Sequence, residues 1–452
     1  MTQIEDIFTY IKEHEDSFVT RVMDYVRHPS ISATDIGIRE VATLLVDHLD
    51  GLGFDARLVE TPGHPFVLGQ RVVDPSKPTV LLYGHYDVQP PDPLDAWVSP
   101  PFEPEVRDGR IWARGIGDNK GQHFAQLLAI EAHLEVTGTL PCNIIFCLEG
   151  EEEIGSPQIA DFVRAHMDEL QADLVVTSDG PLHESGQPVV TFGVRGVASF
   201  DLVAKGASRD VHSGNFGGIV PNPIWTLVHL LATMKDSEGH ITVEGITEPV
   251  IPATNLELDA ASRLPLDLET VMADLGLETL DGPLDRPYWD RLMFYPTLTI
   301  NGLHGGYDGP GSKTVLPNRA IAKCDVRLVE PLTPNHVFER IEAHVAKHAP
   351  KVEVVRHNGM LPSKTPMDTP FAAVVTRAVK SARGVEPLLY PTVGGSLPDY
   401  VWTKILKKPA FVVPYANADE ANHAPNENLE VVRFIDGIRT GASLLYELGR
   451  VG

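Results

Sequence analysis

The sequence is poor in cysteine and in positive charge. Its three cysteines, Cys142, Cys147 and Cys324, form no Cys-x-x-Cys pair and are odd in number, which indicates a reducing compartment with buried thiols; a catalytic cysteine is the alternative. Lys and Arg total 37 against 62 Asp and Glu, which gives a net charge of −25. Because so much negative charge repels phosphate backbones and anionic lipids, we expect no nucleic-acid partner and no membrane partner.

Long apolar runs are also missing. None approaches the roughly 18 residues that a transmembrane helix needs. The N-terminal residues 1–18 are acidic and contain no apolar core, so they do not predict a signal peptide. We therefore expect a cytoplasmic protein. A composition of 43% apolar and 22% charged residues is typical of a globular chain, and the length allows two or three domains.

Short apolar runs of strand length alternate with helical patterns in the first part of the chain. The runs cover residues 79–83, 143–148 and 174–177, and the helical stretches between them cover 119–136 and 157–167. This alternation predicts an α/β/α domain around a mainly parallel, buried central sheet. In such sheets, functional groups gather at the carboxyl ends of the strands.

The pattern changes after Gly196 and returns near Asp368, with a Pro-, Gly- and Leu-rich region before residue 312. We infer that a strand-and-helix module interrupts the α/β domain. The expected boundaries are 1–195 and 366–452 for the α/β domain and 196–365 for the inserted α+β domain. Further helices are expected at 1–28, 38–52, 224–234, 335–347, 370–382 and 431–448, and further strands at 55–59, 66–72, 198–204, 320–329, 387–390 and 410–413.

Polar residues that can bind metals follow the predicted strands. His85 comes directly after the run 79–83, and Asp87 could accept a hydrogen bond from its second ring nitrogen. Asp179 follows the run 174–177 in the same way. A polar loop or an Asp-Gly turn is the alternative interpretation of each motif alone.

An acidic cluster follows the second apolar run. Residues 149–153 read Glu-Gly-Glu-Glu-Glu, and packing these charges together costs free energy unless cations compensate. The alternative is a solvated acidic loop. If the cluster is catalytic, one glutamate binds metal while its neighbour acts as general base.

Two more candidates lie elsewhere in the chain. Asp118 follows two glycines in Gly115-Ile-Gly117-Asp118, where a helix cap is the alternative role. A carboxylate has two oxygens, so this residue could bridge two cations. His423 lies in a loop near the C-terminal strands. Nitrogen and oxygen ligands without thiolate suit zinc, manganese or cobalt.

In this order, the motifs resemble the aminoacylase/carboxypeptidase G/carnosinase family of two-metal peptidases, closest to its cytosolic non-specific dipeptidase branch. The resemblance covers nearly the whole chain. It implies two divalent cations, with zinc favoured over manganese or cobalt, and Asp118 as the bridging ligand. Glu152 would be the general base, Asp87 would orient His85, and the Asp118–Asn119 peptide bond would be cis. The implied metal ligands are His85, Asp118, Glu153, Asp179 and His423.

The resemblance also gives the inserted domain a role as a lid and dimerisation domain. Asp210-Val-His212-Ser-Gly resembles the motif whose histidine reaches the partner subunit's active site, which implies a homodimer. Thr314 and Arg327 resemble the residues that bind the substrate or its C-terminal carboxylate, and the planar guanidinium group of arginine suits that task. Gly395 and Ser396 resemble a substrate-binding loop.

The expected reaction is hydrolysis of the peptide bond of dipeptides or short peptides. The alternative is an amidohydrolase that acts on N-acyl or N-carbamoyl amino acids by the same chemistry, because the acidic stretch before His423 departs from the family's pattern. A non-catalytic scaffold with the same fold is the third hypothesis. It would lack a ligand or the base, whereas every expected position is filled in this sequence.

Overall fold

Two compact units make up residues 2–451, which the computed structural model describes. The first unit contains the residues up to Gly193, the segment Thr365–Tyr390 and the residues from Val401 onward. The second contains Val194–Lys364 and the loop Pro391–Tyr400, although the chain on both sides of that loop belongs to the first unit. The chain therefore leaves the first unit and returns to it.

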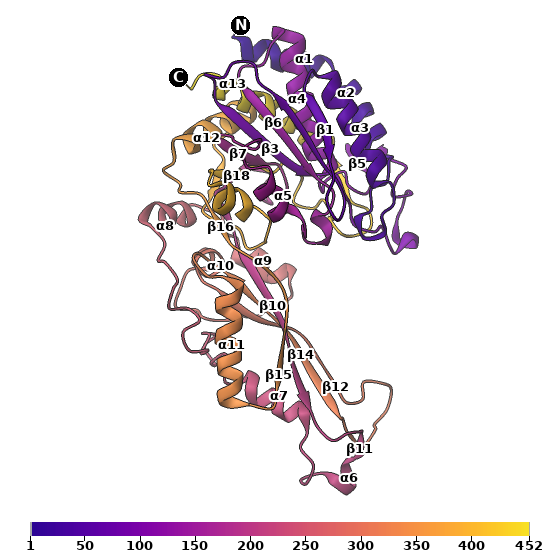
Figure 1. Ribbon diagram of the computed structural model, residues 1–452, viewed down its shortest axis with the longest axis vertical. Coiled ribbons are helices and arrows are strands. Elements are labelled where there is room, and N and C mark those ends of the chain that lie inside the picture. The colour runs from indigo at the N-terminus through magenta and orange to yellow at the C-terminus, as the bar shows by residue number, and fades with distance from the viewer. Residues whose placement is uncertain (1, 452) are drawn as a thin grey trace. The chain divides into compact units, whose positions relative to one another are not determined.

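An eight-stranded sheet forms the centre of the first unit, in the order β1-β2-β6-β3-β7-β18-β8-β17 (Figure 1). The four middle strands, β6, β3, β7 and β18, are parallel to one another, whereas β1, β2 and β8 introduce antiparallel pairs. The strands are β1 Asp55–Val59, β2 Phe66–Arg71, β3 Thr79–His85, β6 Asn143–Glu149, β7 Leu174–Thr177, β8 Val189–Thr191, β17 Leu388–Tyr390 and β18 Ala410–Val412. The mainly parallel character predicted from the apolar runs is confirmed.

Both faces of this sheet are covered, which explains why the middle strands read as continuous apolar runs. Val80 and Leu82 of β3 belong to the large core shared with the N-terminal and C-terminal helices. Tyr83 points to the other face and contacts the ring of Trp402, with ring centroids 5.3 Å apart. Helices on both sides give the three-layer α/β/α arrangement that was expected.

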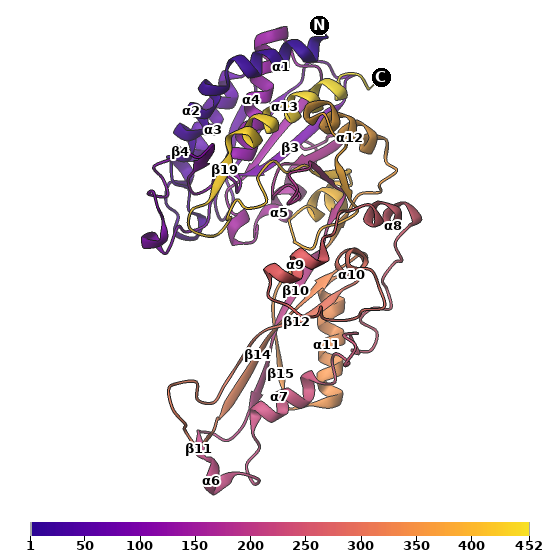
Figure 2. The ribbon, with the colours of Figure 1, turned by 180° about the vertical axis from the view of Figure 1, so that it is seen from behind.

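The helices of one layer contact each other as well as the sheet; Figure 2 shows α4 and α13 side by side. The helices of this unit are α1 Gln3–Glu13, α2 Glu15–Val26, α3 Ile38–Gly51, α4 Lys120–Thr137, α5 Ile159–Ala165, α12 Pro370–Arg383, α13 Val431–Leu448 and the π-helix Val401–Leu406. The expected N-terminal helix is two helices that meet at His14. A small sheet contains β4 Glu105–Arg107, β5 Arg110–Trp112 and β19 Asn428–Glu430.

The second unit is an α+β module around a four-stranded sheet, in the order β12-β14-β10-β15. The strands are β10 Gly196–Lys205, β12 Thr297–Gly305, β14 Arg319–Leu328 and β15 Glu353–Met360, and a short pair joins β11 Val211–His212 to β13 Val315–Leu316. The helices are α6 Ser213–Phe216, α7 Pro223–Leu231, α8 Asn255–Ser262, α9 Leu268–Asp274, α10 Tyr288–Phe294 and α11 Pro334–His348. Helices α7 and α11 pack on the sheet and close a separate core.

Among residues 2–451, no helix is both long enough and apolar enough to cross a bilayer. All three cysteines are buried and free. This is the arrangement that their number and spacing predicted.

Candidate metal centre

The carboxyl ends of three neighbouring strands bring the candidate ligands together. His85 is the last residue of β3, the acidic cluster follows β6, and Asp179 comes two residues after β7. Because β3 lies between β6 and β7 and is parallel to both, these side chains start from one edge of the sheet. The topology therefore places the polar groups where an α/β sheet usually carries its site.

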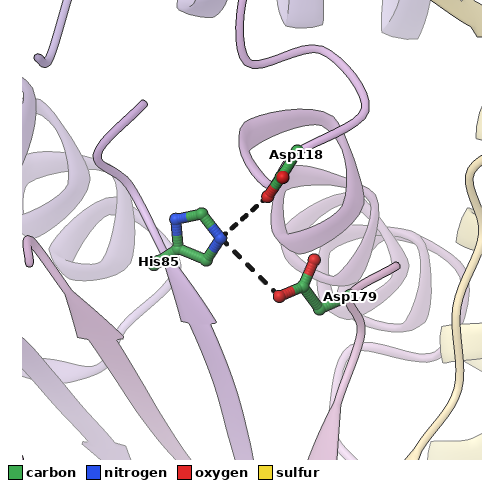
Figure 3. Close-up of side chains that lie close together, drawn as sticks. All are labelled: His85, Asp118 and Asp179. Carbon is green, nitrogen blue, oxygen red and sulfur yellow. Dashed lines mark hydrogen bonds and ion pairs between the residues drawn. The ribbon is translucent and has the colours of Figure 1, made fainter. Parts of the chain in front are cut away.

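The first group of possible ligands contains His85, Asp118 and Asp179 (Figure 3). The Nε2 atom of His85 lies 3.0 Å from Oδ1 of Asp118 and 3.6 Å from Oδ2 of Asp179. The three side chains are 0%, 13% and 7% exposed. Two carboxylates and an imidazole are thus held together almost out of contact with water.

The second group contains Asp118, Glu153 and His423. Nε2 of His423 lies 3.1 Å from Oδ2 of Asp118 and 3.1 Å from Oε2 of Glu153. Asp118 consequently belongs to both groups and turns one carboxylate oxygen to each. The His423 side chain is 54% exposed, so the second group opens toward solvent on this side.

A second glutamate near the C-terminus holds the turn that carries Asp118. One oxygen of Glu427 accepts the backbone N–H groups of Gly117 and Asp118 at 2.9 and 3.0 Å. The other accepts the N–H of Gly115 and a guanidinium N–H of Arg114, both at 2.8 Å. This buried carboxylate fixes the backbone on which the shared ligand stands. The sequence assigns Glu427 no role, because only its position four residues after His423 marks it.

The peptide bond between Asp118 and Asn119 is cis, as the family resemblance implied. The Asn119 side-chain oxygen accepts the backbone N–H of His85 at 3.1 Å. The segment that carries His85 and the segment that carries Asp118 are therefore joined directly by this hydrogen bond.

Asp87 connects His85 with the acidic cluster. Nδ1 of His85 lies 3.1 Å from the backbone carbonyl of Asp87 and 3.4 Å from its carboxylate. The same carboxylate accepts the backbone N–H groups of Glu152 and Glu153 at 3.2 and 3.1 Å. The nearer acceptor for the histidine is thus the carbonyl, while the Asp87 carboxylate shapes the loop after β6.

The acidic groups crowd one another in this pocket. Burial raises the pKa of Glu152 well above its usual range, and the charges of Asp179 and Asp118 add to the increase against the opposing effect of the nearby histidine. Burial also raises the pKa of Glu153, although a hydrogen bond from His423 opposes the change. Excess negative charge among nitrogen and oxygen donors is what divalent cations neutralise. The donor set therefore fits two such cations that share Asp118.

Glu420 adds a further buried carboxylate beside this turn. It is 2% exposed, and neither of its oxygens has a hydrogen-bond partner among the described residues. Burial raises its pKa well above the usual range, and the charges of Asp118 and Glu427 reinforce the increase. The acidic stretch before His423 was the signal for this residue, but its position against Gly117 could not be predicted.

The remaining candidates lie in the second unit, which contains β14 (Figure 1). His212 and Thr314 face each other with 3.3 Å between Nε2 and Oγ1. Arg327 donates a hydrogen bond to the Ser396 hydroxyl at 3.0 Å, and Gly395 precedes that serine. The structure does not bring the first pair to the second within one chain, because β14 starts five residues after Thr314 and carries Arg327 near its other end.

A three-layer α/β unit with two ligand groups that share one aspartate is typical of metal-dependent hydrolases. Comparison with known proteins identifies the family. Residues 81–448 match the family described as Peptidase family M20/M25/M40, and the chain belongs to this family. The chain is 33% identical to the Cys-Gly metallodipeptidase dug1 of Schizosaccharomyces pombe, over 99% of both chains. It is 31% identical to the human Beta-Ala-His dipeptidase, over 99% of this chain and 93% of that one.

A solved structure shows the same fold. The crystal structure of an M20 family metallo-carboxypeptidase, Sso-CP2 from Sulfolobus solfataricus, superimposes with a TM-score of 0.89 at 33% identity. The match covers 96% of this chain and 99% of that chain. Both the expected fold class and the expected family are thereby confirmed.

Proposed function

We propose that this chain hydrolyses the peptide bond of dipeptides with the help of two divalent cations. The observation that carries the proposal is the position of Asp118, which takes part in two groups of possible ligands. The relatives that match the whole chain are named as dipeptidases for Cys-Gly and Beta-Ala-His. Since the free thiols are buried and the surface is acidic, we further propose that it acts in the cytoplasm.

One cation would be held by His85, Asp118 and Asp179, and the other by Asp118, Glu153 and His423. Oxygen and imidazole ligands suit zinc best, with manganese or cobalt as alternatives. Cations bound there would polarise a carbonyl oxygen and lower the pKa of water.

Glu152 is the proposed general base. It has no place in either ligand group and lies in the same acidic loop as the proposed ligand Glu153, so its carboxylate is free to transfer a proton. It would take a proton from the attacking water and deliver it to the leaving amine. Asp87 supports this role, because it holds the Glu152 backbone while it contacts His85.

Arg327, Ser396 and Gly395 are proposed to bind the C-terminal carboxylate of the substrate. A guanidinium group beside a hydroxyl offers the paired donors that a carboxylate accepts. From residue 319 to residue 327, β14 spans about 26 Å, whereas an extended dipeptide is only about 7 Å long. One substrate cannot reach both ends.

We therefore propose a homodimer in which His212 and Thr314 act at the metal centre of the partner subunit. Both side chains are exposed or partly exposed on the second unit and contact each other. His212 would steady the negative charge that develops on the carbonyl oxygen. Active enzyme at dilutions where it is monomeric would contradict this part of the proposal.

A substrate panel tests the function. Metal-loaded protein is incubated with dipeptides, with tripeptides and with N-acyl and N-carbamoyl amino acids, and released amino acids are measured. Dipeptide hydrolysis is expected. Activity on the acylated amino acids alone would favour the amidohydrolase alternative, which the whole-chain relatives do not support.

A further inference from the structure

Arg195 binds three successive carbonyl groups of one loop in the second unit. Its backbone N–H lies 3.3 Å from the carbonyl oxygen of Val393 and 3.1 Å from that of Gly395. Its side-chain Nε donates to the carbonyl of Gly394 at 3.0 Å. The residue is 7% exposed. A single buried side chain and its own backbone thus fix the whole loop.

This loop places Ser396 against Arg327. The serine follows directly after the three carbonyls, and its hydroxyl receives the guanidinium N–H of Arg327 at 3.0 Å. A β-carbon at Gly394 would lie 3.1 Å from Nη2 of Arg195, so this position leaves little room for a side chain. The guanidinium group is therefore packed against the backbone that carries the proposed carboxylate site.

The two arginines are close enough to affect each other's charge. Burial lowers the pKa of Arg195 to about 10, and the charge of Arg327 contributes to the decrease, against the opposing charge of Asp325. Asp325 also lies 3.7 Å from Nε of Arg327 and receives a hydrogen bond from Asn301. The Asp325 carboxylate therefore contacts Arg327 and is near enough to Arg195 to influence its charge.

A donor remains available on Arg195. Its Nη1 atom is buried and has no hydrogen-bond partner among the described residues. An unpaired charged donor in a buried position costs free energy until it meets an acceptor. A carboxylate acceptor near the two arginines would find two guanidinium groups, of which one keeps an unused donor.

We propose that Arg195 is a positioning and specificity-determining residue for the substrate's C-terminal carboxylate. It holds the loop so that Ser396 and Arg327 meet, and its charge increases the preference for a free carboxylate over an amide. This inference rests on the proposed dipeptidase function. A residue that only braced the loop would affect stability and all substrates equally, without regard to the charge of the C-terminus.

The experiment compares a hydrolysed dipeptide with its C-terminal amide, using wild-type protein and the variants Arg195→Met and Arg195→Lys. A hydrogen bond to a charged group contributes about 1.5–3 kcal/mol, so we expect Arg195→Met to raise KM for the free dipeptide by roughly 10- to 150-fold. The KM for the amide and both kcat values should change far less. Arg195→Lys keeps the charge and should recover part of the preference for the free carboxylate.

Arg340→Met is the matched control, because Arg340 also belongs to the second unit and has a buried nitrogen without a hydrogen-bond partner among the described residues. Its side chain lies beside Gly245, where an added β-carbon would be 3.2 Å from Cδ of Arg340. The control should keep the KM of the wild type for both substrates. Thermal unfolding of each variant shows whether it is folded.

If Arg195→Met does not fold, a double-mutant cycle with Arg195→Lys and Ser396→Ala replaces it. If Arg195 acts by holding the loop, the effects of the two substitutions on KM should be strongly non-additive. Additive effects would overturn the inference. It would also be overturned if Arg195→Met had the same ratio of KM for the amide to KM for the free dipeptide as the wild type. Failure of the wild type to hydrolyse any dipeptide would instead overturn the proposed function.

Discussion

Asp87 holds Glu152 by its backbone, with 3.2 Å between the carboxylate oxygen of Asp87 and the amide nitrogen. The same carboxylate holds the next residue and lies 3.4 Å from His85. One fully buried aspartate therefore couples the proposed base, a proposed ligand and a histidine. This contact therefore contributes to the position of the proposed base relative to the proposed metal ligands.

Replacement of Asp87 by Ala should lower kcat or metal affinity by roughly 10- to 100-fold, the usual effect of removing a group that orients metal ligands. The physical reason is the loss of both backbone acceptors for the loop after β6. Steady-state kinetics at several metal concentrations separate the two effects. Wild-type kinetics in the variant would show that the loop holds its shape without Asp87.

Glu152→Gln should lower kcat by about 10²–10⁴-fold, because the amide cannot accept the proton. Metal content and KM should stay close to those of the wild type, since Glu152 belongs to neither ligand group. The neighbouring Glu151→Gln is the control, because Glu151 is another buried glutamate in the same cluster. Equal loss of activity in both variants would argue against a special role for Glu152.

Glu427→Gln should destabilise the protein by about 3–5 kcal/mol, since it breaks a buried ion pair and leaves the charge of Arg114 without its partner. Urea unfolding measures the change. Glu430→Gln provides the comparison, because Glu430 pairs with arginines that are 24% exposed and such pairs contribute only about 0–1 kcal/mol. A smaller effect at Glu427 than at Glu430 would contradict the bracing role.

Removal of divalent cations should abolish hydrolysis and lower Tm. Ligands that bind only the folded state stabilise it by about 2.7 kcal/mol when their free concentration is 100 times Kd. Calorimetry with chelator and then with added zinc, manganese or cobalt measures the effect, and Asp118→Asn should remove most of it. A Tm that does not respond to chelation or to added metal would contradict the two-cation site.

Stability should fall as the pH rises toward 8 because of Glu149. Burial raises the pKa of this carboxyl to about 8, against the opposing hydrogen bond from Tyr83, whereas an unfolded glutamate has a pKa of about 4.3. Between these two pKa values, the folded state holds a proton that the unfolded state has lost. The stabilising contribution of Glu149 is therefore complete below the pKa of the unfolded state, decreases as the pH rises, and is lost above the pKa of the folded state. Glu149→Gln should unfold with a weaker dependence on pH over this range.

Sequence patterns predicted the first unit well, because its elements are long or buried on both faces. Helix α13 has the predicted bounds, and β7 does as well. In contrast, α8, α9 and α10 are seven or eight residues long, which is too short for a helical period to stand out. Strand β12 is mostly exposed and therefore lacks the alternation that marks a strand.

The site was predictable where a ligand directly follows a buried strand, as His85 and Asp179 do. Contacts between distant segments could not be predicted. The hydrogen bonds of Glu427 to the turn at Asp118 and the contacts of Arg195 with the Val393–Gly395 loop involve backbone groups, and backbone groups leave no trace in the order of side chains. Their partners become visible only when the chain is folded.

The contact between Glu427 and the N–H of Asp118 joins residues 309 positions apart. His423 comes from the same late segment, so one short stretch near the C-terminus supplies both a proposed ligand and the support for the shared aspartate. Almost the whole chain must therefore be synthesised before the proposed second cation site is complete. A chain that ended before this stretch would lack both His423 and the carboxylate that holds the turn at Asp118.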